Sequence, residues 1–144
     1  MNPSRSAPEE ALMRRLAALL ALALTSVALA ADDKEGKPLS PAEAIRRVGQ
    51  KVTVEMRVRA SKNALEHRGE IYLDSEENFR DEKNLAVVIN KDGAAHFKDA
   101  GVVDPAAHFK GKTIRVSGTV TLQEKRPRIV VTDPAQLRLV TRKE

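Results

Sequence analysis

The stretch GKTIRVSGTVTLQEKRPRIVV, residues 111–131, decides the fold class, because apolar and polar residues alternate along two segments joined by a polar turn. The first segment has an apolar face made of Ile114, Val116, Val120 and Leu122. This period of two predicts a β-strand with one buried side, EKRP predicts the turn, and RIVV predicts the returning strand. Gly118 interrupts the first strand at its middle, where a glycine usually marks a bulge or a barrel corner. The stretch therefore predicts a hairpin in a curved sheet.

Three segments upstream also have strand character. KVTVEMRVRA (51–60) alternates strictly, and EIYLD (70–74) places Ile71 and Leu73 on one face and Tyr72 on the other. LAVVIN (85–90) is a continuous apolar run, which suits a central strand. The polar segments between them, SKNALEHRG (61–69) and SEENFRDEKN (75–84), are predicted to be loops, and Phe79 is expected to pin the second one.

Two helical regions are predicted outside these strands. Ser40, Pro41 and Glu43 form a helix start with a capping box, and Gly49 ends the helix. The connection KDGAAHFKDAGVVDPAAHFKGK (91–112) contains AAHFK twice, at 94–98 and 106–110. Each copy predicts an amphipathic turn whose phenylalanine packs on the sheet while histidine and lysine face water. The predicted fold is all-β with short helices.

Five short strands with one irregular, partly helical crossover between the third and the fourth match an OB-type barrel. Closure would remove the exposed edges of this valine-rich sheet. An open five-stranded sheet with a helix packed on one face is the competing architecture. We favour the barrel because a long first strand and a long fourth strand with a glycine at its middle are what a curling sheet needs.

The N-terminus predicts export. Arg14 and Arg15 precede the apolar run LAALLALAL, and Ala28-Leu29-Ala30 has the small-x-small pattern of a signal-peptidase site. We therefore expect a signal peptide over residues 1–31, with cleavage near Ala30 or Ala31 and a natural start that can lie at Met13. A membrane anchor is disfavoured, because nine apolar residues fall short of the roughly 20 that span a bilayer. Residues 32–39 predict a flexible leader, residues 40–144 form the expected domain, and the protein would be periplasmic or extracellular.

Composition narrows the function classes. The chain has no cysteine, which excludes disulfides and attachment of lipid at a cysteine. Without residues 1–31, 113 residues remain, with 22 basic and 18 acidic side chains. This mildly basic balance permits a polyanionic partner but does not demand one.

Residues 111–140, GKTIRVSGTVTLQEKRPRIVVTDPAQLRLV, resemble the closing hairpin of small bacterial OB-fold domains of the nucleic-acid-binding type. VGQKVTVEMRV, IYLDS and NLAVVI are similar to the first three strands of exported members that carry a signal peptide, so the resemblance covers about residues 44–140. It implies an OB fold and a nucleic-acid ligand. Leu85 and Ala86 depart from the pattern, since such domains often carry an aromatic residue and a threonine there.

Catalytic and metal sites find little support in the sequence. His96 and His108, with Asp99 or Asp104, are twelve residues apart, whereas compact zinc motifs space their ligands three to five residues apart. A calcium loop that began at Asp74 in the acidic segment 74–82 would need glycine at position 79 and glutamate at position 85, where the chain has Phe79 and Leu85. We therefore expect no metal, no cofactor and no enzymatic activity.

A basic surface is the stronger candidate, because OB folds bind ligands across strands two and three and with the loops between strands one and two and strands four and five. The residues expected to form it are Arg57, Arg59, Lys62, Arg68, Tyr72, Arg115, Lys125, Arg126 and Arg128. The arginines would neutralise phosphates of a single-stranded nucleic acid or another polyanion, and Tyr72 would stack on a base or sugar. Two alternatives stay open: a merely solvated barrel exterior, and a scaffold that binds an envelope protein.

Overall fold

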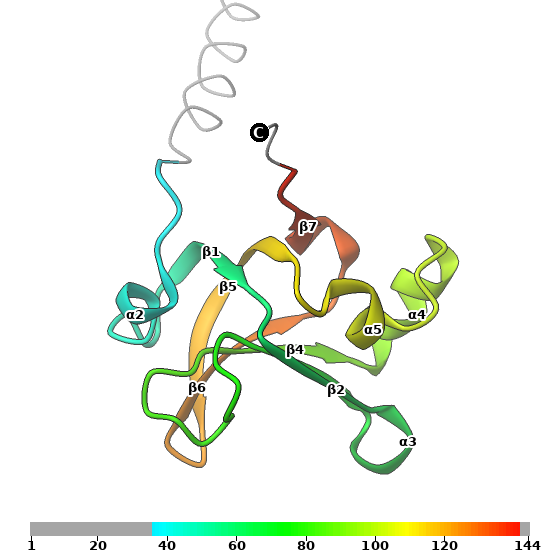
Figure 1. The fold of residues 1–144 in the computed structure, drawn as a ribbon, viewed down its shortest axis with the longest axis horizontal. Helices are drawn as coiled ribbons and strands as arrows, with labels where there is room; N and C mark the ends of the chain where they lie inside the picture. The colour runs from blue at the N-terminus through cyan, green and yellow to red at the C-terminus, as the bar shows by residue number, and fades with distance from the viewer. Residues whose placement is uncertain (1–35, 142–144) are drawn as a thin grey trace, which may run out of the picture. The chain divides into compact units, whose positions relative to one another are not determined.

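The computed structural model describes residues 36–141, so the predicted signal peptide and residues 32–35 of the predicted leader lie outside the described residues. The described elements follow in the order α2 (Pro41–Ala44), β1 (Lys51–Arg57), β2 (Ala60–Ala64), α3 (Leu65–Arg68), β3 (Glu70–Asp74), β4 (Ala86–Asn90), α4 (Lys91–Asp99), α5 (Pro105–Phe109), β5 (Thr113–Gln123), β6 (Arg126–Val131), the 3-10 turn η1 (Pro134–Gln136) and β7 (Leu137–Leu139). Strands predominate and the helices are short, which confirms the predicted all-β class (Figure 1). Within residues 36–141, no helix has the length and apolar character needed to cross a membrane.

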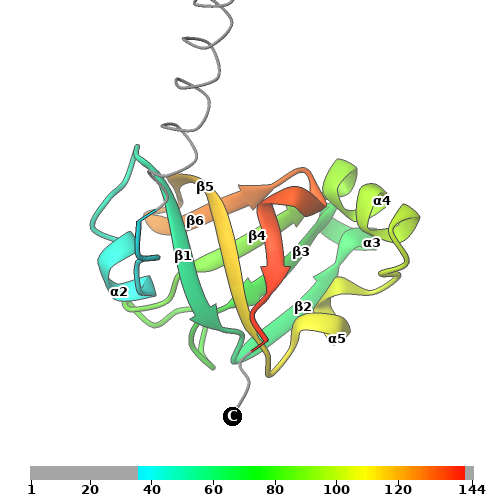
Figure 2. The same ribbon diagram turned by 90° about the horizontal axis from the view of Figure 1, so that it is seen from above.

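The strands form one strongly curled sheet (Figure 2). Hydrogen-bonded neighbours follow the order β1-β5-β6-β4-β3-β2, and β7 also pairs with β5. The two end strands, β1 and β2, do not pair with each other; they are successive halves of one bent strand joined by Val58 and Arg59. The Val58 amide donates to the Lys112 carbonyl over 2.9 Å, and the Arg59 amide donates to the Asp74 carbonyl over 2.9 Å. The bend thus transfers the strand from the β5 side to the β3 side, and the topology is that of an OB-type barrel.

The number of strands differs from the prediction, because residues 36–141 contain seven instead of five. Ala60–Ala64 is β2, although residues 61–69 were expected to be a loop. All five of its residues pair with β3, and this pairing outweighs the weak apolar pattern of the segment. Residues 65–68 of the segment form the short helix α3. Beyond the last predicted strand, Leu137–Leu139 form β7, which pairs with β5 opposite Ile114, Arg115 and Val116.

Gly118 lies where β5 exchanges partners. Residues 113–119 of β5 pair with β1, and residues 120–123 pair with β6. A Cβ at position 118 would lie 2.6 Å from Cγ2 of Ile129, so the close approach requires glycine. The predicted corner is confirmed. Leu122, however, is not on the buried face as expected: it is 55% exposed, near the end of the β5–β6 hairpin.

Alternate residues of β1, β3, β4, β5 and β6, together with Leu137 of β7, fill the barrel interior, and the connection between β4 and β5 covers one end. Phe97 of α4 and Phe109 of α5 are each 3% exposed, and their rings meet edge to face with centroids 5.8 Å apart. The two AAHFK copies are therefore packing turns, as predicted. Figure 2 shows α4 and α5 together at one end of the barrel and α2 at the other.

The first helix begins as predicted and ends earlier. Ser40 and Glu43 form a complete capping box, with the Glu43 amide donating to the Ser40 hydroxyl over 3.2 Å and the Ser40 amide donating to Glu43 Oε1 over 3.2 Å. The α-helix ends at Ala44, and turns lead on to Gly49. Just before the cap, the Leu39 amide donates to the Thr53 carbonyl of β1 over 2.8 Å, and the Leu39 carbonyl accepts from the Glu55 amide over 2.9 Å.

Candidate nucleic-acid interface

A groove of about 480 Å³ lies on the outer face of the barrel, between α3, the loop 75–85 and the β5–β6 hairpin. It brings together five of the nine residues predicted to bind a ligand: Lys62, Arg68, Tyr72, Arg126 and Arg128. The other lining residues are Glu70, Asp74, Phe79, Asn84, Ala86, Gln123, Glu124 and Pro127. In Figure 1 the loop 75–85 lies beside the β5–β6 hairpin, and α3 lies at the far end of β2.

The strand register explains the shape of this groove. One row across the outer face consists of Lys62, Tyr72, Val88 and Val130, which are paired from β2 through β3 and β4 to β6. The next row consists of Ala60, Asp74, Ala86 and Arg128. The second row contains two alanines, and three of its members, Asp74, Ala86 and Arg128, line the groove.

Arg128 and Tyr72 share one carboxylate on this face. Nη1 of Arg128 lies 3.1 Å from Oε2 of Glu70, and the Tyr72 hydroxyl donates to Oε1 of Glu70 over 2.8 Å. Burial raises the pKa of the Tyr72 hydroxyl, and the hydrogen bond to Glu70 acts in the same direction, whereas Arg68 opposes the rise. Tyr72 therefore stays protonated and oriented, which fits a stacking surface.

Phe79 occupies a different position from the one predicted for it. It was expected to pin the loop by burial, but it is 50% exposed and lines the groove. The guanidinium carbons of Arg126 and Arg80 lie 5.0 Å and 5.4 Å from its ring centroid, within the range of cation–π attraction. An arginine of the hairpin and an aromatic ring of the loop thus meet across the groove. No local sequence pattern indicates the contact between Phe79 and Arg126, because these two residues are 47 positions apart.

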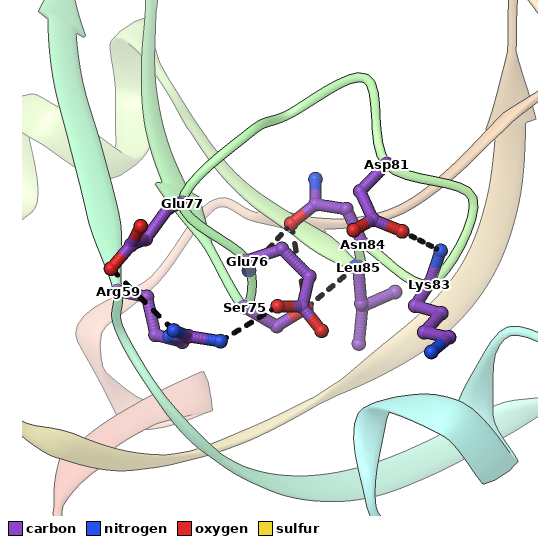
Figure 3. Close-up of polar contacts among 8 residues, drawn as sticks. All are labelled: Arg59, Ser75, Glu76, Glu77, Asp81, Lys83, Asn84 and Leu85. Atoms are coloured by element: carbon purple, nitrogen blue, oxygen red, sulfur yellow. Dashed lines mark hydrogen bonds and ion pairs between the residues drawn. The ribbon is translucent and has the colours of Figure 1, made fainter.

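Polar side chains, rather than Phe79, anchor the loop 75–85 (Figure 3). Asn84, 6% exposed, accepts from the Glu76 amide over 2.9 Å and donates to Oδ1 of Asp74 over 3.0 Å. The Leu85 amide donates to the Ser75 hydroxyl over 2.9 Å. These contacts close the base of the loop and leave its tip, with Phe79, exposed at the groove.

Asp74 is a buried carboxyl group in the wall of the groove. Its residue is 7% exposed, and burial raises the pKa of the carboxyl group, while the hydrogen bond from Asn84 lowers it. A carboxylate in such surroundings is stabilised by each further donor that it accepts from. The sequence offered Asp74 only as the first residue of a disfavoured calcium loop, not as part of the basic surface, although it ends a predicted strand and faces outward, like Tyr72.

The other predicted ligand residues lie elsewhere. Arg57 and Arg59 line a separate hollow beside Lys110 and Gly111. Arg59 also pairs with Glu76 at 2.9 Å and with Glu77 at 3.5 Å, as Figure 3 shows.

Arg115 and Lys125 also lie outside the set of residues that line the groove. Arg115 of β5 pairs with Glu55 of β1 at 2.9 Å, so it belongs to the β1–β5 face. Lys125 is exposed at the tip of the hairpin, between the lining residues Glu124 and Arg126. Both Glu124 and Lys125 have positive φ, of 52° and 66°, as the tight turn requires.

The histidines of the two AAHFK copies do not meet in a site. Nδ1 of His96 is 3.1 Å from the carbonyl oxygen of Thr132, and the His108 ring packs edge to face on Phe109 at 4.7 Å. Among residues 36–141, no group of three or more histidine, aspartate and glutamate side chains is arranged to hold a metal ion.

Comparisons with other proteins identify the fold. No protein-family model and no curated protein sequence matches the chain. The structure is similar to part of a protein described as an aspartyl-tRNA synthetase from Leishmania major Friedlin, with a TM-score of 0.52 and 14% identity, over 76% of this chain and 22% of that one.

Two further solved structures are similar. One is an asparaginyl-tRNA synthetase from Pyrococcus horikoshii, with a TM-score of 0.49 and 16% identity, over 72% of this chain and 23% of that one. The other is the OBody AM1L10 bound to hen egg-white lysozyme, with a TM-score of 0.49 and 13% identity, over 74% of this chain and 97% of that one. The chain spans about a quarter of the length of the two synthetases. The strand order, together with the similarity to the Leishmania major protein, shows an OB fold.

Proposed function

We propose that this domain binds single-stranded nucleic acid along the groove between α3, the loop 75–85 and the β5–β6 hairpin. The observation that carries the proposal is the convergence of four basic side chains and two aromatic rings in that groove: Lys62, Arg68, Arg126 and Arg128 with Tyr72 and Phe79. Positive side chains that follow a backbone and rings on which bases stack are the two components of single-strand binding sites. A site for single-stranded nucleic acid needs both the positive side chains and the rings.

The residues divide into two roles. Lys62, Arg68 and Arg126 are exposed and can reach phosphates, whereas the side chain of Arg128 is mostly buried and paired with Glu70. Arg128 therefore orients Glu70 and, through it, the Tyr72 hydroxyl. Phe79 supplies the second ring, and Arg126, which now lies over that ring, can follow a phosphate when a base takes its place.

The position of the groove agrees with this role. OB folds use the face of their second and third strands together with flanking loops to bind oligonucleotides and oligosaccharides. Here β3 and β4 supply that face, and the β5–β6 hairpin supplies one flank. The similar synthetases have tRNA in their names, but at 14–16% identity that likeness extends to the fold alone. The groove carries the functional proposal.

We also propose that the protein acts after export and without catalysis. The N-terminal sequence, with its apolar run and its Ala28-Leu29-Ala30 pattern, supports export. The basic and aromatic side chains of the groove support a binding role without catalysis. A scaffold for an envelope protein is the competing role, and the binding experiment separates the two.

The test is a titration of fluorescein-labelled single-stranded DNA with the protein at several salt concentrations. We expect affinity to fall with salt, with a slope of about −0.7 for each phosphate contacted. The double variant Arg126→Ala/Arg128→Ala should lose most of this binding, while Lys98→Ala/Lys110→Ala, which removes the same charge from α4 and the end of the β4–β5 connection, should retain it. No binding at low salt would refute the proposal and favour a protein partner.

A further inference from the structure

The floor of the groove is acidic although its rim is basic. Asp74 faces outward at the end of β3, and both of its cross-strand neighbours are alanines, Ala60 on β2 and Ala86 on β4. Short side chains on both sides leave the carboxylate at the bottom of a hollow, with Tyr72 rising in the adjacent row. A flat ring that entered this hollow would meet the carboxylate with its edge.

The carboxylate has capacity for further hydrogen bonds. Oδ1 of Asp74 accepts from Nδ2 of Asn84 over 3.0 Å, and an ionised carboxylate offers about four acceptor positions in all. The same Nδ2 lies 3.4 Å from the carbonyl oxygen of Phe79. Asn84 thus connects Asp74 to the backbone of Phe79, and the side chains of both residues line the same groove.

The four common bases differ in what they present to a carboxylate. Guanine has two adjacent donors on its Watson–Crick edge, the ring N1–H and the exocyclic 2-amino group, and they match the two oxygens of a carboxylate. Adenine and cytosine place a ring-nitrogen acceptor beside their amino group, which a carboxylate repels, and thymine has a single donor between two carbonyl groups. Single-stranded ligands expose these edges to the protein.

Building on the nucleic-acid-binding function proposed above, we propose that the Asp74 hollow is a base-specific subsite that prefers guanine. Phe79 or Tyr72 stacks on the base, and the Asp74 carboxylate accepts from guanine N1–H and the 2-amino group. The basic rim binds the flanking phosphates without regard to sequence. The groove therefore combines general affinity, from its rim, with selectivity, from its floor.

The test compares five thymidine heptamers that differ only at the central base, which is guanine, hypoxanthine, adenine, cytosine or thymine. Hypoxanthine keeps the N1–H and lacks only the 2-amino group. We expect the guanine heptamer to bind roughly tenfold more tightly than the thymine heptamer, with hypoxanthine between them. In Asp74→Asn the preference for guanine should fall to within about twofold, because the amide turns one acceptor into a donor. Asp99→Asn, an equal loss of charge at the end of α4, should retain the preference.

The outcomes separate the two proposals. If all five heptamers bind wild-type protein equally and with the expected salt dependence, the guanine subsite is wrong and the general binding function stands. If Asp74→Asn keeps the preference, the subsite is not at Asp74. If no heptamer binds even at low salt, both proposals fail. Should Asp74→Asn not fold, the ranking of guanine over hypoxanthine and adenine in the wild-type protein still decides the matter, since equal affinities would overturn it.

Discussion

Two outer faces of this barrel carry the same kind of ion pair and differ in everything around it. On the β1–β5 face, Arg115 pairs with Glu55 at 2.9 Å, beside a hydroxyl pair between Thr53 and Ser117 at 2.9 Å. On the groove face, Arg128 pairs with Glu70 at 3.1 Å. An outward arginine in an alternating strand therefore does not by itself mark a ligand site.

The neighbours of each pair make the difference. On the β1–β5 face, the outward cross-strand pairs contain no alanine: they are Lys51–Thr119, Thr53–Ser117, Glu55–Arg115 and Arg57–Thr113. On the groove face, Ala60 and Ala86 hollow one row, and the loop 75–85 and the hairpin rise on either side. The groove face thus presents two rings beside the largely buried carboxylate of Asp74, and it is the face that we expect to bind.

Both faces depend on the same interior, so the largest expected effect is the loss of a core ring. Phe97→Ala should lower the free energy of unfolding by about 3–5 kcal/mol, because a buried ring that contacts Phe109 is removed and leaves a cavity. Urea unfolding followed by circular dichroism measures this. His96→Ala, next to it on the exposed side of α4, should cost less than about 1 kcal/mol. A costlier His96 would show that the histidine copies have a structural role that we have not assigned.

Phe79→Ala distinguishes a ligand-facing ring from a core ring. The side chain is half exposed, so we expect stability to change by less than about 1 kcal/mol. Affinity for single-stranded DNA should fall by roughly 5- to 150-fold, the equivalent of one lost base stack of about 1–3 kcal/mol. Phe79→Trp should retain binding. A large loss of stability with unchanged affinity would return Phe79 to the loop-pinning role expected from the sequence.

Arg126→Ala and Arg115→Ala set the two faces directly against each other. Arg126 is exposed at the groove, so its loss should weaken DNA binding about threefold to tenfold and reduce the salt slope by about 0.7. Arg115→Ala should leave binding within twofold and change stability by about 1 kcal/mol or less, as is usual for a partly exposed ion pair. Equal effects on binding would mean that the whole exterior attracts DNA without a defined site.

The pH dependence of stability should reveal Asp74, with the smallest effect of the set. Its folded-state pKa is raised by burial, so the protein binds this proton more tightly when folded than when unfolded. The contribution of the protonated Asp74 carboxyl group to the free energy of unfolding is therefore fully present below the pKa of this group in the unfolded state. It is lost as the pH rises through the pKa of this group in the folded state. Relative to wild type, Asp74→Asn should become progressively more stable as the pH is raised from about 3 to 7, measured by thermal unfolding. Asp99→Asn should show no such trend.

Periodic elements could be predicted from the sequence, and the groove could not. The corner at Gly118 and the packing of Phe97 and Phe109 follow from local patterns of two and of about 3.6 residues. Five groove residues were also identified, since strand alternation and turn composition place them outward. The hollow at Asp74 depends on the register that pairs it with Ala60 and Ala86, and the loop lengths and the Val58–Arg59 bend that set this register give no local signal. Phe79 was misplaced because a ring in a polar loop is usually an anchor, whereas here Asn84 and Ser75 hold the loop.

Amide chemical-shift mapping by NMR, with a single-stranded DNA heptamer added to isotope-labelled protein, tests most directly whether one face binds. We predict that the largest shifts fall on groove residues, notably Lys62, Tyr72, Phe79, Ala86 and Arg126, and that Thr53, Glu55, Arg115 and Ser117 on the β1–β5 face stay unchanged. Shifts spread evenly over both faces, or centred on the β1–β5 face, would contradict the assignment of the groove as the binding site.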